Sequence, residues 1–275
     1  MLALKILHVF SVGTSLLRNF AEHGGRAKLA RVVRRWAWLS PDDEEQLMVE
    51  RRARRGCRVF EALVNYLDAD PREASAELNA FYGLTPKPRP GEDGVVLYST
   101  DTGTGWLCAR ALGVHLEEAG FRVEGPHRLR GFGLGPDRFE EGLMSVVDLV
   151  VPRIKRTKAR GLRVYVNPTG GFKPEAAFLV LASALAGADR AYYVHEAFRE
   201  VVELPLLPIK LVEELVEPVV KLGGEVPLHE AGKLLQLHGA ALHVLKDRGL
   251  VEEAEGFLKL KAWVRELLKP VSELA

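Results

Sequence analysis

The chain has 275 residues, of which 47% are hydrophobic and 27% charged, and a chain of this kind forms one large or two modest soluble domains. Its formal net charge of +1 provides no overall field toward nucleic acid or membranes, so any anion site must be local. The two cysteines, Cys57 and Cys108, lack metal-ligand spacing, and no apolar run reaches the roughly 20 residues of a membrane span. We therefore expect a cytoplasmic protein with reduced thiols, no secretion signal and no membrane contact.

The first predicted elements are a strand over residues 1–11 and a helix over residues 14–22. The turn that joins them, Ser11-Val12-Gly13-Thr14-Ser15, combines a glycine with hydroxyl side chains, and the helix behind it offers unpaired N–H groups at its N-terminus. Arg18 follows one turn into the helix, where it is either a solvated surface residue or a clamp that lines an anion site.

A long helical and charged region follows, over residues 27–79. Its arginines could form an RNA-binding patch, but acidic residues lie among them, and mixed charge at helical spacing favours a solvated, salt-bridged face. Apolar residues recur at helical spacing over residues 59–67 and predict either buried core or a dimer contact. The extended segment 85–91 returns the chain to the sheet. We treat residues 40–90 as a helical insertion whose role the sequence does not assign.

A second strand, over residues 95–99, ends in another polar, glycine-containing turn that opens a helix over residues 103–119. This turn contains Gly103-x-Gly105 but lacks the third glycine of a dinucleotide fingerprint, so the pattern does not indicate nicotinamide binding. The candidate ligand contacts in this turn are Asp101, Thr102 and Gly103.

The most informative stretch is Asn167-Pro168-Thr169-Gly170-Gly171-Phe172-Lys173, between a strand over residues 162–167 and a helix that Pro174 opens. Glycines allow close approach to a ligand, and Lys173 adds a full charge to the partial positive charge of the helix N-terminus. This chemistry suits a phosphate, although the same glycines could serve only to bend the chain, because the full P-loop spacing is absent. The candidate contacts are Asn167, Thr169, Gly170, Gly171 and Phe172, with Lys173 as the cation.

Further elements complete an alternation of strands and helices. They are a short strand over residues 121–123, a loop over 130–135 that is either a plain connection or a flap, a helix over 137–150, and a strand over 190–194. Such alternation implies a mostly parallel sheet in an α/β, Rossmann-like domain over residues 1–205. The carboxyl ends of parallel strands share one edge, so the three polar turns are expected to meet there, where ligands bind.

His195 and Glu196 end the last strand, as either a general acid–base pair or, in the interpretation we prefer, a structural pair. Neither they nor any other His, Asp or Glu falls into a recognised metal pattern. We therefore assign no metal.

Residues 206–275 read as a second domain. A helix over 209–221, interrupted at Pro218, precedes a helix-turn-helix and two short strands, which is the order of a winged helix-turn-helix. Such a domain can bind DNA, but here nine Lys and Arg stand against eleven Asp and Glu, and DNA binding needs several cations that face phosphates. We expect no DNA binding and assign the domain to dimerisation or to a lid.

Three stretches match a known family in the expected order: Ser-Val-Gly-Thr-Ser-Leu-Leu-Arg-Asn, Asn-Pro-Thr-Gly-Gly-Phe-Lys, and Ala-Tyr-Tyr-Val-His-Glu with Leu-Pro-Leu-Leu-Pro after it. They resemble the CRISPR-associated ring nucleases, stand-alone proteins built on the CARF domain, a Rossmann-like sensor of cyclic oligoadenylates. The resemblance covers residues 1–210, and its second motif is the most specific. Pro168 departs from the pattern, since an alanine is common there.

The resemblance implies a homodimer that binds cyclic tetra-adenylate across its two-fold axis. It also implies cleavage, without a metal or other cofactor, into linear di-adenylate with a 2′,3′-cyclic phosphate. Lys173 would then stabilise the added negative charge, and Ser15 or its neighbour Thr14 would position the ribose or the phosphate. The remaining contacts implied from the first turn are Ser11, Gly13, Thr14 and Arg18.

Three functions are compatible with the sequence. The first is this ring nuclease. The second is a ligand-responsive regulator of the CARF and winged-helix type, which would need a basic recognition helix. The third is an unrelated nucleotide-dependent enzyme, which would need a complete glycine-rich fingerprint or a set of metal ligands. The sequence favours the first because the features that the other two require are missing.

Overall fold

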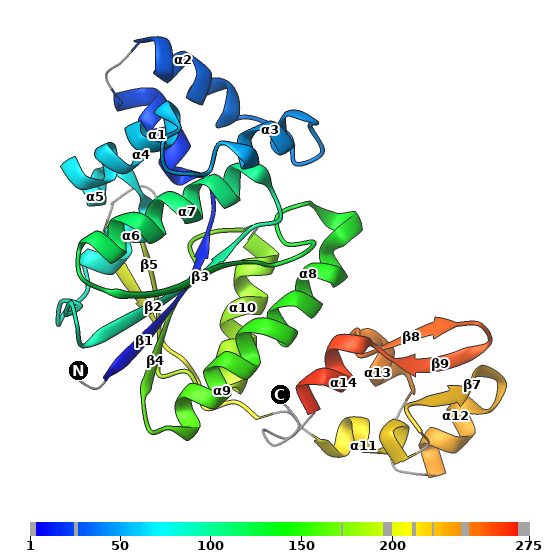
Figure 1. The fold of residues 1–275 in the computed structure, drawn as a ribbon. Coiled ribbons are helices and arrows are strands. Elements are labelled where there is room, and N and C mark those ends of the chain that lie inside the picture. Colours follow the sequence, from blue (N-terminus) through cyan, green and yellow to red (C-terminus); the bar gives the residue numbers. More distant parts are fainter. Residues whose placement is uncertain are drawn as a thin grey trace. The chain divides into compact units, whose positions relative to one another are not determined.

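The computed structural model describes residues 4–24, 27–171, 173–194, 200–210, 213–221, 223–237 and 242–268. The chain divides into two compact units, Met1–Pro208 and Ile209–Ala275 (Figure 1). No helix of the described residues is both long and apolar enough to cross a membrane.

A six-stranded sheet forms the centre of the first unit, in the order β3-β2-β1-β4-β5-β6. Neighbouring strands pair in parallel, except that β6 runs antiparallel to β5. The strand order reverses between β1 and β4, which is the arrangement that opens a crevice at the carboxyl ends of those strands. The predicted α/β fold with a mostly parallel sheet is confirmed. The strands are β1 (Ile6–Val12), β2 (Asp93–Ser99), β3 (Arg122–Arg128), β4 (Arg163–Asn167), β5 (Arg190–Val194) and β6 (Val201–Leu204).

Helices cover both faces of this sheet, with α7 (Gly103–Glu118) and the inserted helices on one face and α8, α9 and α10 (Lys173–Leu185) on the other (Figure 1). Helix α8 (Phe139–Ser145) continues through one π-helical turn, η2 (Val146–Val150), into α9 (Val151–Ala159). The helix predicted over residues 137–150 is therefore too short, because Pro152 lies in the first turn of α9, where a proline is tolerated.

Two strand predictions also need correction. The strand predicted over residues 121–123 extends to Arg128, because a shift in its pairing with β2 accommodates the Gly125–Pro126 step. Strand β6 was not predicted, since its four residues add to the sheet only as an antiparallel edge.

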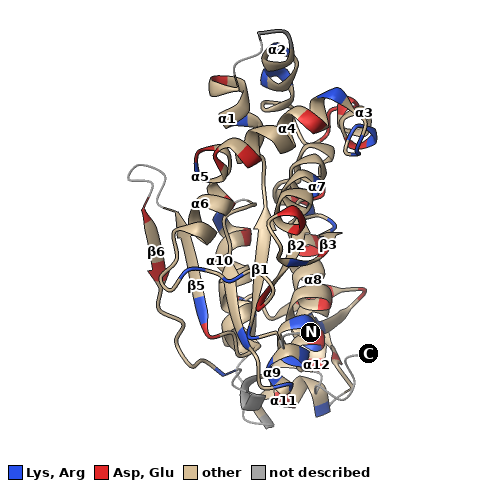
Figure 2. Ribbon diagram, turned by 60° about the vertical axis from the view of Figure 1, so that its left-hand side comes forward, with Lys and Arg blue, Asp and Glu red and all other residues tan. Residues whose placement is uncertain are grey.

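The insertion packs its apolar stripe into the core of the first unit. It contains α3 (Glu45–Arg51), α4 (Arg58–Ala69), α5 (Pro71–Ala74) and α6 (Ala76–Tyr82), and α2 (Ala27–Trp36) lies between it and α1 (Ser15–His23). The stripe predicted on α4 is buried in one cluster with residues of α1 and α7 and with Phe10 and Val12 of β1, so its role as core is confirmed. Figure 2 shows acidic and basic positions interspersed on α3.

Two side-chain caps fix the start of the last inserted helices. The Asp70 carboxylate accepts hydrogen bonds from the backbone N–H groups of Arg72 and Glu73, and the Ser75 hydroxyl accepts one from Leu78. These caps hold α5 and α6 in place beside the carboxyl end of β1.

The second unit has its own core and its own three-stranded antiparallel sheet, in the order β7-β9-β8. Helix α11 (Glu213–Lys221) runs through Pro218, so the predicted interruption there is wrong; Val216 and Val219 anchor the helix in the core on either side of the proline. The order of elements is that of a winged helix-turn-helix. The remaining elements are β7 (Glu225–Pro227), α12 (Leu228–Leu237), α13 (Leu242–Asp247), β8 (Val251–Ala254), β9 (Phe257–Leu260) and α14 (Ala262–Leu268).

Candidate functional site

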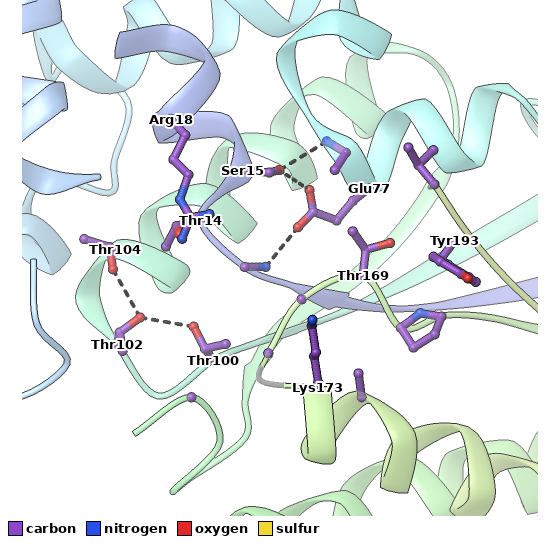
Figure 3. Close-up of a pocket in the computed structure, with 18 of the residues that line it drawn as sticks. Thr14, Ser15, Arg18, Glu77, Thr100, Thr102, Thr104, Thr169, Lys173 and Tyr193 are labelled. Atoms are coloured by element: carbon purple, nitrogen blue, oxygen red, sulfur yellow. Dashed lines mark hydrogen bonds between the residues drawn. The ribbon is translucent and has the colours of Figure 1, made fainter. Parts of the chain in front are cut away.

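An open cleft of about 1240 Å³ lies at the carboxyl ends of β1, β2 and β4. The turns that follow these three strands all contribute to its lining, so they meet as the sequence predicts (Figure 3). Three cationic side chains, Arg18, Arg72 and Lys173, line the cleft beside two acidic ones, Glu73 and Glu77. A mixed lining of this kind can bind an anion and a hydroxyl donor at separate places.

The turn between β4 and α10 presents Lys173 to the cleft. Lys173 is the first residue of α10, its side chain is exposed, and Figure 3 shows it extending from the helix N-terminus into the cleft. Its ammonium makes no hydrogen bond or ion pair with any side chain or backbone group in the described part of the chain. An ammonium without a partner among the described residues, at a helix N-terminus, can attract an anion, as the sequence predicts for this turn.

Close contact with the β1 turn requires the two glycines before Lys173. A Cβ on Gly170 would overlap backbone atoms of Val12 and Gly13, and Gly171 has a φ of 101° with the Phe132 ring against it. The Ser11 hydroxyl locks the same contact, because it donates to the carbonyl of Gly170 at 2.8 Å and accepts from the Gly170 N–H at 3.1 Å. Ser11 is thus buried and joins the two turns instead of lining the cleft.

The turn between β1 and α1 is occupied by a side chain from the insertion. The carboxylate of Glu77 accepts hydrogen bonds from the Gly13 N–H at 3.0 Å, from the Ser15 hydroxyl at 2.6 Å and from the Ser75 hydroxyl at 2.7 Å (Figure 3). Glu77 is only 1% exposed, yet it lines the cleft. Thr14 and Ser15 line the cleft next to it.

Sequence reasoning did not identify Glu77. It belongs to the insertion, 62 residues from Ser15 along the chain, and no motif connects them. The one available signal was a carboxylate within the apolar run Ala76-Glu77-Leu78-Asn79-Ala80-Phe81, because a charge that helical spacing places on a buried face needs partners.

In the third turn, after β2, the Thr102 hydroxyl forms three hydrogen bonds. Thr102 caps α7 by accepting from the Gly105 N–H at 3.0 Å, and it also bonds the hydroxyls of Thr100 and Thr104. All three threonines line the cleft. Asp101 does not, because it accepts from the Gly131 N–H and pairs with Arg128, and Gly103 packs against the backbone of Gln46.

Residues 130–135, which the sequence leaves as connection or flap, fold against the base of the cleft. Phe132 is fully buried, and the Gly133 N–H donates to the buried carboxylate of Glu175 at 2.8 Å. Gly133 itself lines the cleft.

An aromatic surface borders the cleft near α1. The Arg18 guanidinium lies 5.2 Å from the ring centroid of Trp38, and Trp38 is 71% exposed. Both residues line the cleft. An exposed ring that is backed by a guanidinium can stack on a flat, aromatic ligand group.

Asn167, the last residue of β4, connects the elements around the cleft through its hydrogen bonds. It is fully buried, donates from its amide to the Glu77 carbonyl at 2.9 Å, and accepts from the Thr169 hydroxyl. It also hydrogen-bonds the buried Tyr192, whose hydroxyl lies 3.0 Å from Nδ1 of His8. Asn167 therefore links β4, α6 and β5, while Thr169 faces the cleft.

Two candidate regions lie outside the described residues, namely Phe172 and the His195-Glu196 pair. Within the described ranges, no cluster of three or more His, Cys, Asp or Glu side chains could hold a metal ion.

Residues 72–207 match the model of a family described as CRISPR-associated protein (Cas_APE2256). The matched segment is slightly less than half of the chain. It includes α6 with Glu77, the turn after β2 and the complete turn from Asn167 to Lys173. This segment is thus similar in sequence to a CRISPR-associated protein family, as the resemblance noted above implies.

Proposed function

We propose that this protein is a ring nuclease that binds cyclic tetra-adenylate and opens it into linear di-adenylate with a 2′,3′-cyclic phosphate. The observation that supports the proposal best is the ammonium of Lys173 at the N-terminus of α10, which has no partner among the described residues and lies in a cleft that Ser15 also lines. The similarity of residues 72–207 to CRISPR-associated proteins supports the same proposal.

The proposed ligand has two-fold symmetry, so a homodimer with one cleft per protomer suits it. Each protomer would contribute one Lys173 ammonium and one helix N-terminus to the phosphates. Light scattering at micromolar concentration, with and without ligand, tests the assembly, and a monomer in both conditions would contradict it.

Ring opening needs no nucleophile from the protein, because the ribose 2′-hydroxyl attacks the adjacent phosphorus. The protein must hold that oxygen in line with the leaving oxygen and stabilise the negative charge that develops on the phosphoryl group. Lys173 performs the second task, and the turn at Ser15 performs the first. Catalysis by alignment and one charge is slow, which suffices for removing a signal molecule.

The deciding experiment is incubation of the protein with cyclic tetra-adenylate and with cyclic hexa-adenylate in EDTA, followed by separation of the products. We expect di-adenylate with a 2′,3′-cyclic phosphate from the tetramer ring. An intact ring after prolonged incubation with stoichiometric protein would exclude the activity, and a reaction that stops in EDTA would exclude the metal-free mechanism.

The winged-helix order of the second unit favours one alternative, a cyclic-oligoadenylate-responsive transcription regulator without catalysis. Its charges do not support it. Lys246 of α13, the candidate recognition helix, forms an ion pair with Glu253 of the wing, which also carries Glu252 and Glu255. A gel shift with nanomolar affinity for duplex DNA from its own promoter at physiological salt would favour the regulator.

A further inference from the structure

The hydrogen bonds of Ser15 leave it with one specific capability. A serine hydroxyl has one proton to donate and two lone pairs that accept. The Ser15 oxygen accepts from the backbone N–H of Ala76 at 3.1 Å, and its proton points to the Glu77 carboxylate at 2.6 Å. One lone pair remains, so Ser15 can accept one further hydrogen bond and has no proton to offer a ligand.

A phosphate is disfavoured next to Gly13 and Glu77 in the turn between β1 and α1. The Gly13 N–H is already bonded to Glu77, and Glu77 places a full carboxylate inside the turn. A phosphate beside Gly13 would find that N–H and the Ser15 proton engaged and a like charge next to it. A hydroxyl group of a ligand is favoured at this place, because it can donate to the free lone pair of Ser15.

We propose that Glu77 is a positioning residue that orients Ser15 as the acceptor of the ribose 2′-hydroxyl and receives its proton through Ser15. This inference rests on the proposed ring-nuclease function. It divides the cleft into two subsites. Ser15 of α1 forms the ribose subsite, and Lys173 of α10 forms the phosphate subsite.

The step balances without a further reactant. The proton of the 2′-hydroxyl moves to the Ser15 oxygen while the Ser15 proton moves to Glu77. The bond from O2′ to phosphorus forms, the bond from phosphorus to the O5′ leaving oxygen breaks, and that oxygen takes a proton from water. A later exchange with water returns Glu77 to its carboxylate form.

The variant Glu77→Gln tests this directly. The Gly13 N–H can only donate, so it will take the amide oxygen of the glutamine and leave the NH₂ group facing Ser15. Ser15 must then accept from that group and turn its own proton outward. The substitution preserves the shape of the side chain at position 77. It changes Ser15 from a hydrogen-bond acceptor for the ligand into a donor, and it removes the carboxylate that would accept the proton.

Three quantities should be measured on wild type, Glu77→Gln and the control Glu117→Gln, which removes one charge from an exposed position of α7. They are the single-turnover rate of opening of cyclic tetra-adenylate, the Kd for that ring, and the Kd for its fully 2′-deoxy analogue. Thermal unfolding of each variant verifies that it folds.

Wild type and Glu117→Gln should prefer the ribose ring to the deoxy ring by ~10-fold, the effect of one well-placed hydrogen bond. Glu77→Gln should bind both rings about as well as wild type, because the outward proton of Ser15 can donate to the 2′-oxygen, but it should open the ribose ring ~10²-fold more slowly, as expected when proton transfer is lost. A merely structural role for Glu77 would weaken both rings equally.

The outcomes separate this inference from the proposed function. A wild-type protein that neither binds nor opens the ring contradicts both. A wild type that opens the ring, with Glu77→Gln equally fast, contradicts only the role of Glu77. Should Glu77→Gln fail to fold, Ser15→Ala provides the same test, because an unchanged preference for the ribose ring in that variant would refute the subsite.

Discussion

Two turns with similar sequences differ in whether their polar groups are already engaged within the fold. The turn after β1 and the turn after β4 each follow a buried strand, contain glycine and hydroxyl groups, and open a helix. In the first, Glu77 occupies the donors of Gly13 and Ser15. In the second, Lys173 stays without a partner in the described structure. A glycine-containing turn therefore does not reveal by itself whether its donors are available to a ligand.

The difference has a structural cause. The insertion places α6 over the first turn, where the caps at Asp70 and Ser75 fix the position of Glu77. The second turn opens α10, where Lys173 has no partner among the described residues and the buried carboxylate of Glu175, in the first turn of the helix, accepts from the Gly133 N–H. The four predictions below test the two turns and the residues around them, from the largest expected effect to the smallest.

The largest effect should follow from separating the two turns. Gly170→Ala places a Cβ on the backbone of Val12 and Gly13, and the loss of stability should reach about 3 kcal/mol, the upper range for overpacking. Urea unfolding measures this. Gly232→Ala, where nothing lies near the added methyl, is the control and should unfold at the same or a higher urea concentration. Equal stability of both variants would mean that the turns are not in contact.

Removing the charge of the open turn should affect the rate more than binding. Lys173→Ala should slow ring opening by ~10²-fold or more, the loss typical for one electrostatic donor, while affinity falls less because the other turns still hold the ring. Single-turnover cleavage of labelled cyclic tetra-adenylate measures the rate. Lys87→Ala, at an exposed position of the segment before β2, should react like wild type. An unchanged rate in Lys173→Ala would refute the assigned site.

The buried, hydrogen-bonded side chains of His8, Tyr192 and Asn167 should make the free energy of unfolding depend on pH. Burial lowers the pKa of His8 to about 3 from 6.5, so the folded protein keeps His8 neutral while the unfolded chain protonates it below pH 6.5. As far as His8 is concerned, the free energy of unfolding therefore has its full value above pH 6.5. It decreases as the pH falls, by about 2 kcal/mol between pH 7 and pH 5.

His8→Leu isolates this contribution from that of the carboxylates. Urea unfolding at both pH values should show a smaller acid-induced loss in the variant, by the same ~2 kcal/mol. Parallel losses in wild type and variant would mean that His8 is protonated in the folded state.

The smallest effect concerns the aromatic border of the cleft, which neither turn supplies. If Trp38 stacks on a base of the ligand, Trp38→Ala should weaken ring binding by ~10-fold, since stacking on an aromatic side chain is worth about 1–3 kcal/mol. Trp38→Phe should retain most of the affinity. Calorimetric titration measures both, and equal affinities for the alanine variant and wild type would exclude stacking.

Much of the first unit could be predicted from its sequence because strands and helices there have distinct apolar periods. The three polar turns were located at the correct strand ends, and Lys173, Ser15, Thr14 and Arg18 all line the cleft. The predicted ligand contacts Ser11, Asp101, Gly103 and Asn167 do not line it, because their polar or backbone groups are used within the fold. Position in a turn cannot distinguish a side chain that faces the ligand from one that holds the turn.

By itself, the sequence determined the alternation of strands and helices, the winged-helix order within residues 206–275, and the edge of the sheet where polar turns gather, since all of these depend on local periodicity and turn chemistry. Only the tertiary structure decided which donors remain available. Glu77 reaches Ser15 because strand pairing and helix packing bring together residues that are 62 positions apart, and no local pattern encodes a contact between such distant residues.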